Sequence, residues 1–96
     1  MDRHPLGRTG LTATKICFGT SGLGNMPGTY GYEVDEERGR ATIRTIFDGP
    51  ANVLDTSNNY GLGRSEERVG AVIRERGGLP PDFVVSTKLD RDMDTG

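Results

Sequence analysis

Residues 54–61, which read Leu-Asp-Thr-Ser-Asn-Asn-Tyr-Gly, show most about the architecture of this chain, because an apolar run ends there in a carboxylate and a polar loop. The residues before Asp55 have the apolar character of a β-strand. A second apolar run, residues 83–87, leads to Lys88. We therefore expect Asp55 and Lys88 to lie at the carboxyl ends of two strands, with Tyr60 in the loop that follows the first.

Two amphipathic helices are expected between the strands. Asp35 can cap the first, and a Gly-Pro pair at 49–50 ends it. Ser65 can cap the second, and paired glycines at 77–78 end it. Each helix carries apolar residues at i, i+3 or i+4 spacing, which predicts one buried face. These faces consist of Ile43, Ile46 and Phe47 in the first helix and Val69, Val72 and Ile73 in the second.

Two further elements precede the first helix. Residues 5–13 contain glycines suited to a hairpin turn, and residues 15–20 form a short apolar strand. The order hairpin, β, α, β, α, β predicts an α/β fold with a parallel sheet, in which all strands end at one rim. A closed (β/α)8 barrel needs eight units and about 250 residues. This chain supplies two units and one strand, and beyond Lys88 we expect no further helix or strand.

The composition is that of a small, mildly acidic chain. Its 96 residues have a net charge of -2 and a mean hydropathy of -0.56, so we expect residues 1–96 to form a single partial domain. No concentrated basic surface is evident, which argues against a nucleic-acid partner. No apolar run is long enough to span a bilayer, so we expect no membrane partner. The N-terminus lacks an apolar signal segment, and we expect a cytoplasmic protein.

Common metal, hydrolase and nucleotide sites find little support in the sequence. One cysteine, Cys17, and one histidine, His4, are too few for a zinc cluster or a Ser-His-Asp hydrolase. Cys17 lies in an apolar run, and we expect it to be a buried small hydrophobe. Residues 61–66 approach a dinucleotide-binding loop, but Glu66 stands where that fingerprint has Gly or Ala. A carboxylate there would repel a pyrophosphate, which argues against a Rossmann site.

Each of the three strand-end residues also has an ordinary structural interpretation. Asp55 can close a strand as a turn residue, and Tyr60 can be a packed loop aromatic. Lys88 can be a solvated strand end, although this chain has only two lysines. Taken together, a carboxylate, a phenol and an ammonium at one rim suit proton transfer during carbonyl reduction or alcohol oxidation.

The chain contains five ordered segments: residues 6–11 (Leu-Gly-Arg-Thr-Gly-Leu), 18–20 (Phe-Gly-Thr), 55–61 (Asp-Thr-Ser-Asn-Asn-Tyr-Gly), 65–70 (Ser-Glu-Glu-Arg-Val-Gly) and 86–88 (Ser-Thr-Lys). Together they resemble the N-terminal part of aldo-keto reductases. The resemblance implies a (β/α)8 barrel, incomplete in this chain, that binds NADP or NAD at the carboxyl rim and passes hydride between nicotinamide and a carbonyl or sugar substrate. The sequence is also similar to the sugar-oxidising branch that includes D-threo-aldose (L-fucose) dehydrogenases and pyridoxal dehydrogenases.

The resemblance also implies roles for particular residues. Tyr60 would be the proton donor in reduction and the acceptor in oxidation, Lys88 would favour its ionisation, and Asp55 would orient the lysine. The residues near the nicotinamide and ribose would be Gly19, Thr20, Ser21 and Asp55.

The sequence departs from the family pattern in one large respect. The family's active-site histidine, expected after the fourth strand, and the late loops that grip the cofactor phosphates have no counterpart in these 96 residues. We therefore expect a truncated portion of the enzyme that is inactive alone and that, with a sheet edge left open, either self-associates or is only marginally stable. The alternative is a non-catalytic module of the same fold that binds cofactor or serves as a regulatory subunit.

Overall fold

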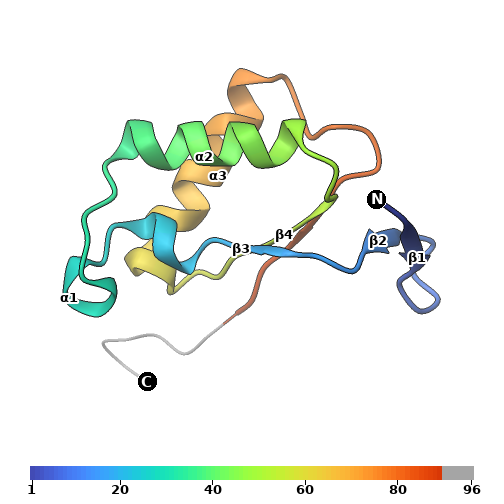
Figure 1. Cartoon of the computed structure of the whole chain (residues 1–96), viewed down its shortest axis with the longest axis horizontal. Coiled ribbons are helices and arrows are strands. Elements are labelled where there is room, and N and C mark those ends of the chain that lie inside the picture. The colour runs from blue at the N-terminus through green and yellow to red at the C-terminus, as the bar shows by residue number, and fades with distance from the viewer. Residues whose placement is uncertain (90–96) are drawn as a thin grey trace.

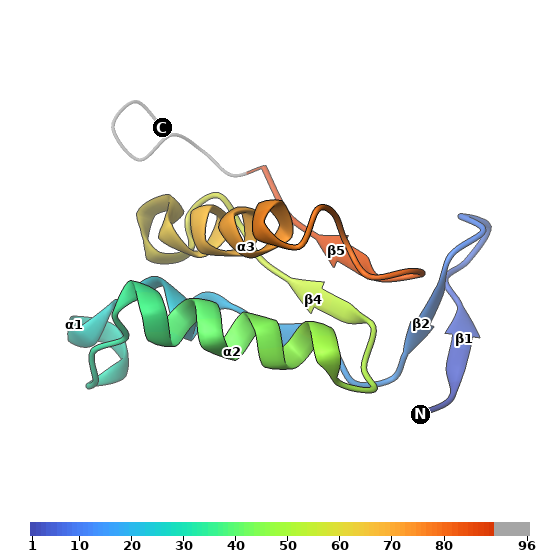
Figure 2. The ribbon, with the colours of Figure 1, turned by 90° about the horizontal axis from the view of Figure 1, so that it is seen from above.

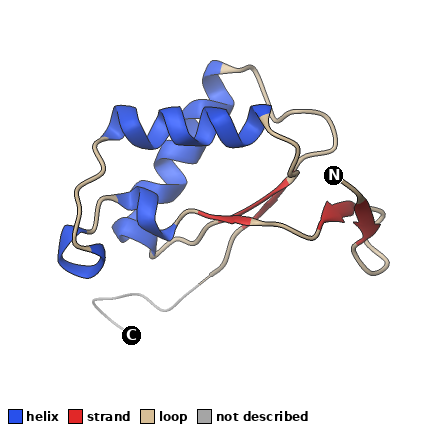
Figure 3. Cartoon of the chain, viewed as in Figure 1, coloured by secondary structure: helices blue, strands red, loops and turns tan. Residues whose placement is uncertain are grey.

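The computed structural model describes residues 1–89, in which a small parallel sheet is covered by helices on one face and joined to a hairpin (Figures 1 and 3). The expectation about the chain beyond Lys88 falls largely on residues 90–96, outside the described part. The elements in chain order are β1 (Arg3–Pro5), β2 (Thr12–Thr14), β3 (Phe18–Gly19), η1 (Ser21–Gly24), α1 (Pro27–Tyr30), α2 (Glu36–Asp48), β4 (Val53–Asp55), η2 (Tyr60–Gly63), α3 (Arg64–Glu75) and β5 (Val84–Ser86).

The predicted βαβαβ order is confirmed. Strands β3, β4 and β5 pair in parallel in that spatial order, with Gly19 opposite Asp55 and Asp55 opposite Ser86. The hairpin also forms, as an antiparallel β1–β2 pair. Strand β3 is shorter than the predicted 15–20, because the Thr14 side chain donates to the Ile16 carbonyl at 2.7 Å and bends the chain before the sheet begins.

Asn52 joins the hairpin to the sheet. Its side-chain amide nitrogen donates to the carbonyls of Thr12 and Asp82 at 2.8 and 2.9 Å, and its amide oxygen accepts from the backbone N–H of Thr14 at 2.8 Å. Because Asn52 is 1% exposed and directly precedes β4, these bonds hold the hairpin at the amino end of the strands. The opposite, carboxyl end of the sheet stays free of the hairpin.

Helices α2 and α3 lie side by side over the same face of the sheet (Figures 1 and 2). The Asp35 side chain caps α2 as predicted, accepting from the Arg38 backbone N–H at 2.8 Å. The predicted apolar faces meet in one core, where Ile43, Leu54 and Val72 are fully buried. The sheet face opposite these helices carries no helix among residues 1–89.

Two predictions from the sequence are wrong. Ser65 does not cap α3: the helix begins at Arg64 with Gly63 as its N-cap, and the fully buried Ser65 hydroxyl donates to the Thr20 carbonyl at 2.7 Å. Cys17 is exposed, because it precedes the short edge strand β3 and receives little cover there. The first error arises from a contact between distant segments and the second from the position of Cys17 beside an edge strand, and a local pattern records neither.

No helix in the described part of the chain has the length and apolar character to cross a bilayer.

Candidate active site

The structure brings Asp55, Tyr60 and Lys88 together at the carboxyl end of the sheet. Asp55 ends β4, Tyr60 begins η2, and Lys88 lies two residues beyond β5. The Lys88 ammonium donates to Asp55 Oδ2 and to the Thr56 carbonyl, both at 2.8 Å. It also lies 4.8 Å from the centroid of the Tyr60 ring. A carboxylate, a cation and a phenol therefore share one small region, as the parallel strand order predicts.

The cation in this group is stabilised by its neighbours. The hydrogen bond that the Lys88 ammonium donates to Asp55, followed by a smaller contribution from Tyr60, raises the pKa of Lys88 above its ordinary 10.5, against a partial opposing effect of desolvation. The Asp55 and Lys88 side chains are 30% and 45% exposed, so solvent weakens the attraction between them. Lys88 stays positively charged at neutral pH and sets a fixed positive charge beside the Tyr60 ring.

The same pair of charges acts on Cys17. Although Cys17 is exposed as a residue, partial desolvation of its thiol raises the thiol pKa, the charge on Asp55 raises it further, and Lys88 opposes this. Cys17 therefore lies within electrostatic reach of the site but favours the neutral thiol, which is the less reactive form.

A tight loop places Tyr60. After it, Gly61, Leu62 and Gly63 all have positive φ values, of 62°, 58° and 98°. Gly61 packs directly on Gly24 of η1: a Cβ added at Gly24 would lie 2.6 Å from Gly61 Cα. Only glycine allows two backbones to approach this closely, so the pair locks η2 against η1.

Two arginines of α3 also hold η1 in place. Arg64 Nε donates to the Gly24 carbonyl at 2.6 Å, and Arg68 Nη1 donates to the carbonyls of Leu23 and Val34 at 2.7 and 2.9 Å. Arg68 is 6% exposed, and its recorded acceptors are backbone carbonyls. Sequence reasoning missed this role. The sequence feature that could have predicted it is the i,i+4 spacing of the two arginines, together with the glycine-rich residues 21–24, whose backbone carbonyls need hydrogen-bond donors.

The residues predicted to meet a cofactor have different surroundings. Gly19 is exposed, and a Cβ added there would meet nothing within 4 Å. Thr20 is fully buried, with its hydroxyl donating to the Asp55 carbonyl at 3.1 Å. Ser21 begins η1, and its hydroxyl shares a hydrogen bond with the Tyr30 hydroxyl. Gly19 thus leaves open space at the rim, whereas the Thr20 side chain supports the position of Asp55.

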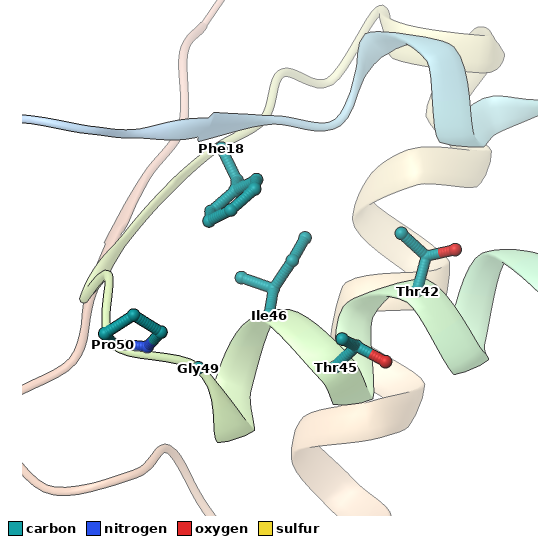
Figure 4. Close-up of a pocket in the computed structure, with 6 residues that line it drawn as sticks. All are labelled: Phe18, Thr42, Thr45, Ile46, Gly49 and Pro50. Carbon is teal, nitrogen blue, oxygen red and sulfur yellow. The ribbon is translucent and has the colours of Figure 1, made fainter.

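An apolar groove lies elsewhere. A groove of about 390 Å³ runs between β3 and α2, where Phe18 and Ile46 face one another (Figure 4). It lies on the helix-covered side of the sheet edge and does not include the three strand-end residues. No group of three or more potential metal ligands occurs among residues 1–89.

Comparison with known proteins identifies the family of the chain. The sequence model of the Aldo/keto reductase family matches residues 15–96. The chain belongs to this family. The match covers all three strands of the parallel sheet and the predicted resemblance is confirmed.

Curated relatives of this aldo-keto reductase chain include enzymes and a channel subunit. It is similar to pyridoxal 4-dehydrogenase of Microbacterium luteolum, with 36% identity over 96% of this chain and 25% of the relative. It is similar to L-galactose dehydrogenase of Arabidopsis thaliana, with 36% identity over 95% of this chain and 27% of the relative. A probable voltage-gated potassium channel subunit beta of Oryza sativa subsp. japonica is 33% identical over 93% of this chain and 25% of the relative. The chain thus spans about a quarter of the length of these relatives.

Proposed function

We propose that this chain contributes part of the active site of an NAD(P)-dependent aldo-keto reductase that converts an aldehyde, a ketone or a sugar hydroxyl. The Lys88 ammonium, held between Asp55 and the Thr56 carbonyl beside Tyr60, is the observation that supports it most. A complete (β/α)8 barrel would add the remaining strands beside β3 and β5, the edge strands of the sheet within residues 1–89. The family membership and the dehydrogenase relatives support the same reaction class.

In this proposal the chain's own residues move the proton. The Tyr60 hydroxyl donates a proton to the carbonyl oxygen in reduction and accepts one in oxidation. The positive charge on Lys88 stabilises the phenolate that remains, and Asp55 fixes the lysine in place. The nicotinamide of NADP or NAD would supply or accept the hydride when bound.

The residues at the rim fit the nicotinamide end of such a cofactor. The open space at Gly19 permits a flat ring or a ribose to approach the backbone closely. Ser21 follows Thr20 in the chain, and the Thr20 backbone N–H donates to the Asp55 carbonyl at 3.0 Å. In this proposal Gly19 and Ser21 contact the ligand, and buried Thr20 keeps Asp55 in register.

A grafted enzyme tests the proposal. Residues 6–89 would replace the matching segment of a pyridoxal 4-dehydrogenase, and turnover would be compared with and without Tyr60→Phe. Loss of a positioned proton donor should lower kcat by roughly 100-fold to 10,000-fold. Tyr32→Phe, at a tyrosine that is 54% exposed, is the matched control and should change little. Turnover of the Tyr60→Phe graft within a few-fold of its parent contradicts the proposal.

The similarity to a potassium channel subunit beta favours a second candidate, a cofactor-binding or regulatory module without turnover. Nicotinamide fluorescence distinguishes the two: the module should bind NADPH and leave it unoxidised when aldehydes are added. Sustained NADPH oxidation by a protein carrying this segment would reject the second candidate.

A further inference from the structure

A hydrogen bond outside the proposed chemistry links α3 to the chain next to Lys88. The Thr87 hydroxyl donates to Glu66 Oε2 at 2.6 Å. Glu66 lies half-buried in the first turn of α3, and Thr87 is the residue between β5 and the site lysine. The bond therefore joins a helix packed on the sheet to the backbone that carries Lys88.

This bond lies just beyond the last backbone hydrogen bond between β5 and the rest of the sheet. The last backbone contact of β5 is the Ser86 carbonyl, which accepts from the Thr56 backbone N–H at 2.8 Å. Within the described part of the chain, the next recorded attachments are the Thr87 hydroxyl and then the Lys88 ammonium. Lysine has a flexible four-carbon stem, so its ammonium reaches two acceptors reliably only when its Cα is held.

We propose that Glu66 is a positioning residue: by accepting the Thr87 hydroxyl it fixes the backbone at Lys88 and so keeps the ammonium on Asp55 and Thr56. The effect of Glu66 on turnover rests on the proposed function, whereas its effect on the position of the Lys88 ammonium does not. The raised pKa of Lys88, caused first by Asp55, supplies a direct readout of that contact.

The simpler interpretation is that Glu66 only stabilises the positive end of the helix dipole. Glu67 provides the comparison, because it lies in the same first turn of α3 with its side chain exposed to solvent. A dipole effect would be shared by the two carboxylates. A positioning effect belongs to Glu66 and Thr87 alone.

Competitive acylation of the two lysines tests the proposal on this chain. Lys15 serves as the internal reference, and the ratio of Lys88 to Lys15 labelling reports the free-amine fraction of Lys88. Thr87→Val, which removes the hydroxyl and leaves the charge unchanged, should raise this ratio roughly twofold to tenfold. Thr87→Ser should restore the original ratio, and Glu66→Gln should raise it.

The remaining variants separate the explanations. Glu67→Gln should leave the labelling ratio unchanged, because that carboxylate does not contact Thr87. If Thr87→Val keeps the original ratio, or if Glu67→Gln raises it as much as Glu66→Gln does, the proposal is overturned. Direct titration of the lysine side-chain resonances of the same variants gives an independent second measurement. Neither readout depends on turnover, so failure of the proposed function, seen with Tyr60→Phe in the graft, is recognised separately.

Discussion

Gly24→Ala should destabilise this chain through steric overlap at one site. An added Cβ would lie 2.6 Å from Gly61 Cα, 2.7 Å from Ser65 Oγ and 3.0 Å from Gly61 N. Non-bonded carbons prefer separations of roughly 3.5–4.0 Å, so η1 and η2 must separate by about 1 Å. The φ of Gly24 lies outside the left-handed region, and alanine meets no conformational obstacle there. The expected loss of stability therefore comes entirely from packing.

The size of the effect follows from what must move. Overfilling a packed site costs about 1–3 kcal/mol. We expect the upper half of this range, because two of the three atoms are backbone and Ser65 is fully buried and bonded to Thr20. A loss of about 2 kcal/mol lowers the equilibrium constant for folding roughly thirtyfold, a large part of the stability of a small domain.

Urea unfolding followed by far-ultraviolet circular dichroism measures this loss. With a slope of about 1–2 kcal/mol per molar urea, the midpoint of Gly24→Ala should fall by about 1–2 M. Gly28→Ala is the matched control, because its Cβ would meet nothing within 4 Å and it lies in the short helix α1. A variant already unfolded in buffer, beside a folded control, supports the same conclusion. Equal midpoints for the two alanine variants refute the reasoning.

Three further outcomes are expected. Ile43→Ala should lower the free energy of unfolding by about 2–5 kcal/mol, because Ile43 is fully buried, whereas Leu79→Ala, at a 42% exposed position, should cost far less in the same urea assay. The pKa of Lys88 is raised in the folded state, so its stabilising contribution is complete below pH 10.5 and is lost as pH rises through the higher folded value. Above pH 10.5 the urea midpoint of the unsubstituted chain should therefore fall more steeply with pH than that of Asp55→Asn. Sedimentation should show concentration-dependent association that Phe18→Ser weakens, because Phe18 is 41% exposed in the groove at the β3 edge; a monomer at all concentrations contradicts this.

The parts of the fold that local chemistry determines were predictable from the sequence. Asp35 caps α2 as its residue type and position indicate, and the Glu36–Arg40 pair at i,i+4 spacing forms at 3.3 Å. Strand order then places Asp55 and Lys88 at one rim, because right-handed βαβ connections leave little choice. The meeting of these two side chains is thus a consequence of topology.

The parts that depend on long-range contacts were not predictable. Ser65 has the residue type of a helix cap, yet its hydroxyl bonds a carbonyl 45 residues away. Arg68 has the type of a solvated surface residue, yet it is buried against Leu23 and Val34. In both cases a tertiary partner outweighs the local preference, and one sequence without its fold gives no sign of which partner that is.

The left-handed run that follows Tyr60 also determines how this loop would respond to saturation mutagenesis. Gly61 and Gly63 should be intolerant positions, since every side chain there adds strain and at Gly61 also collides with Gly24. Leu62 already bears that strain while 67% exposed, so glycine or asparagine should be enriched there over the native residue. Within residues 61–63, only position 62 can therefore be changed without adding strain. A substitution of Leu62 could stabilise the loop that follows Tyr60 without altering any group of the proposed site.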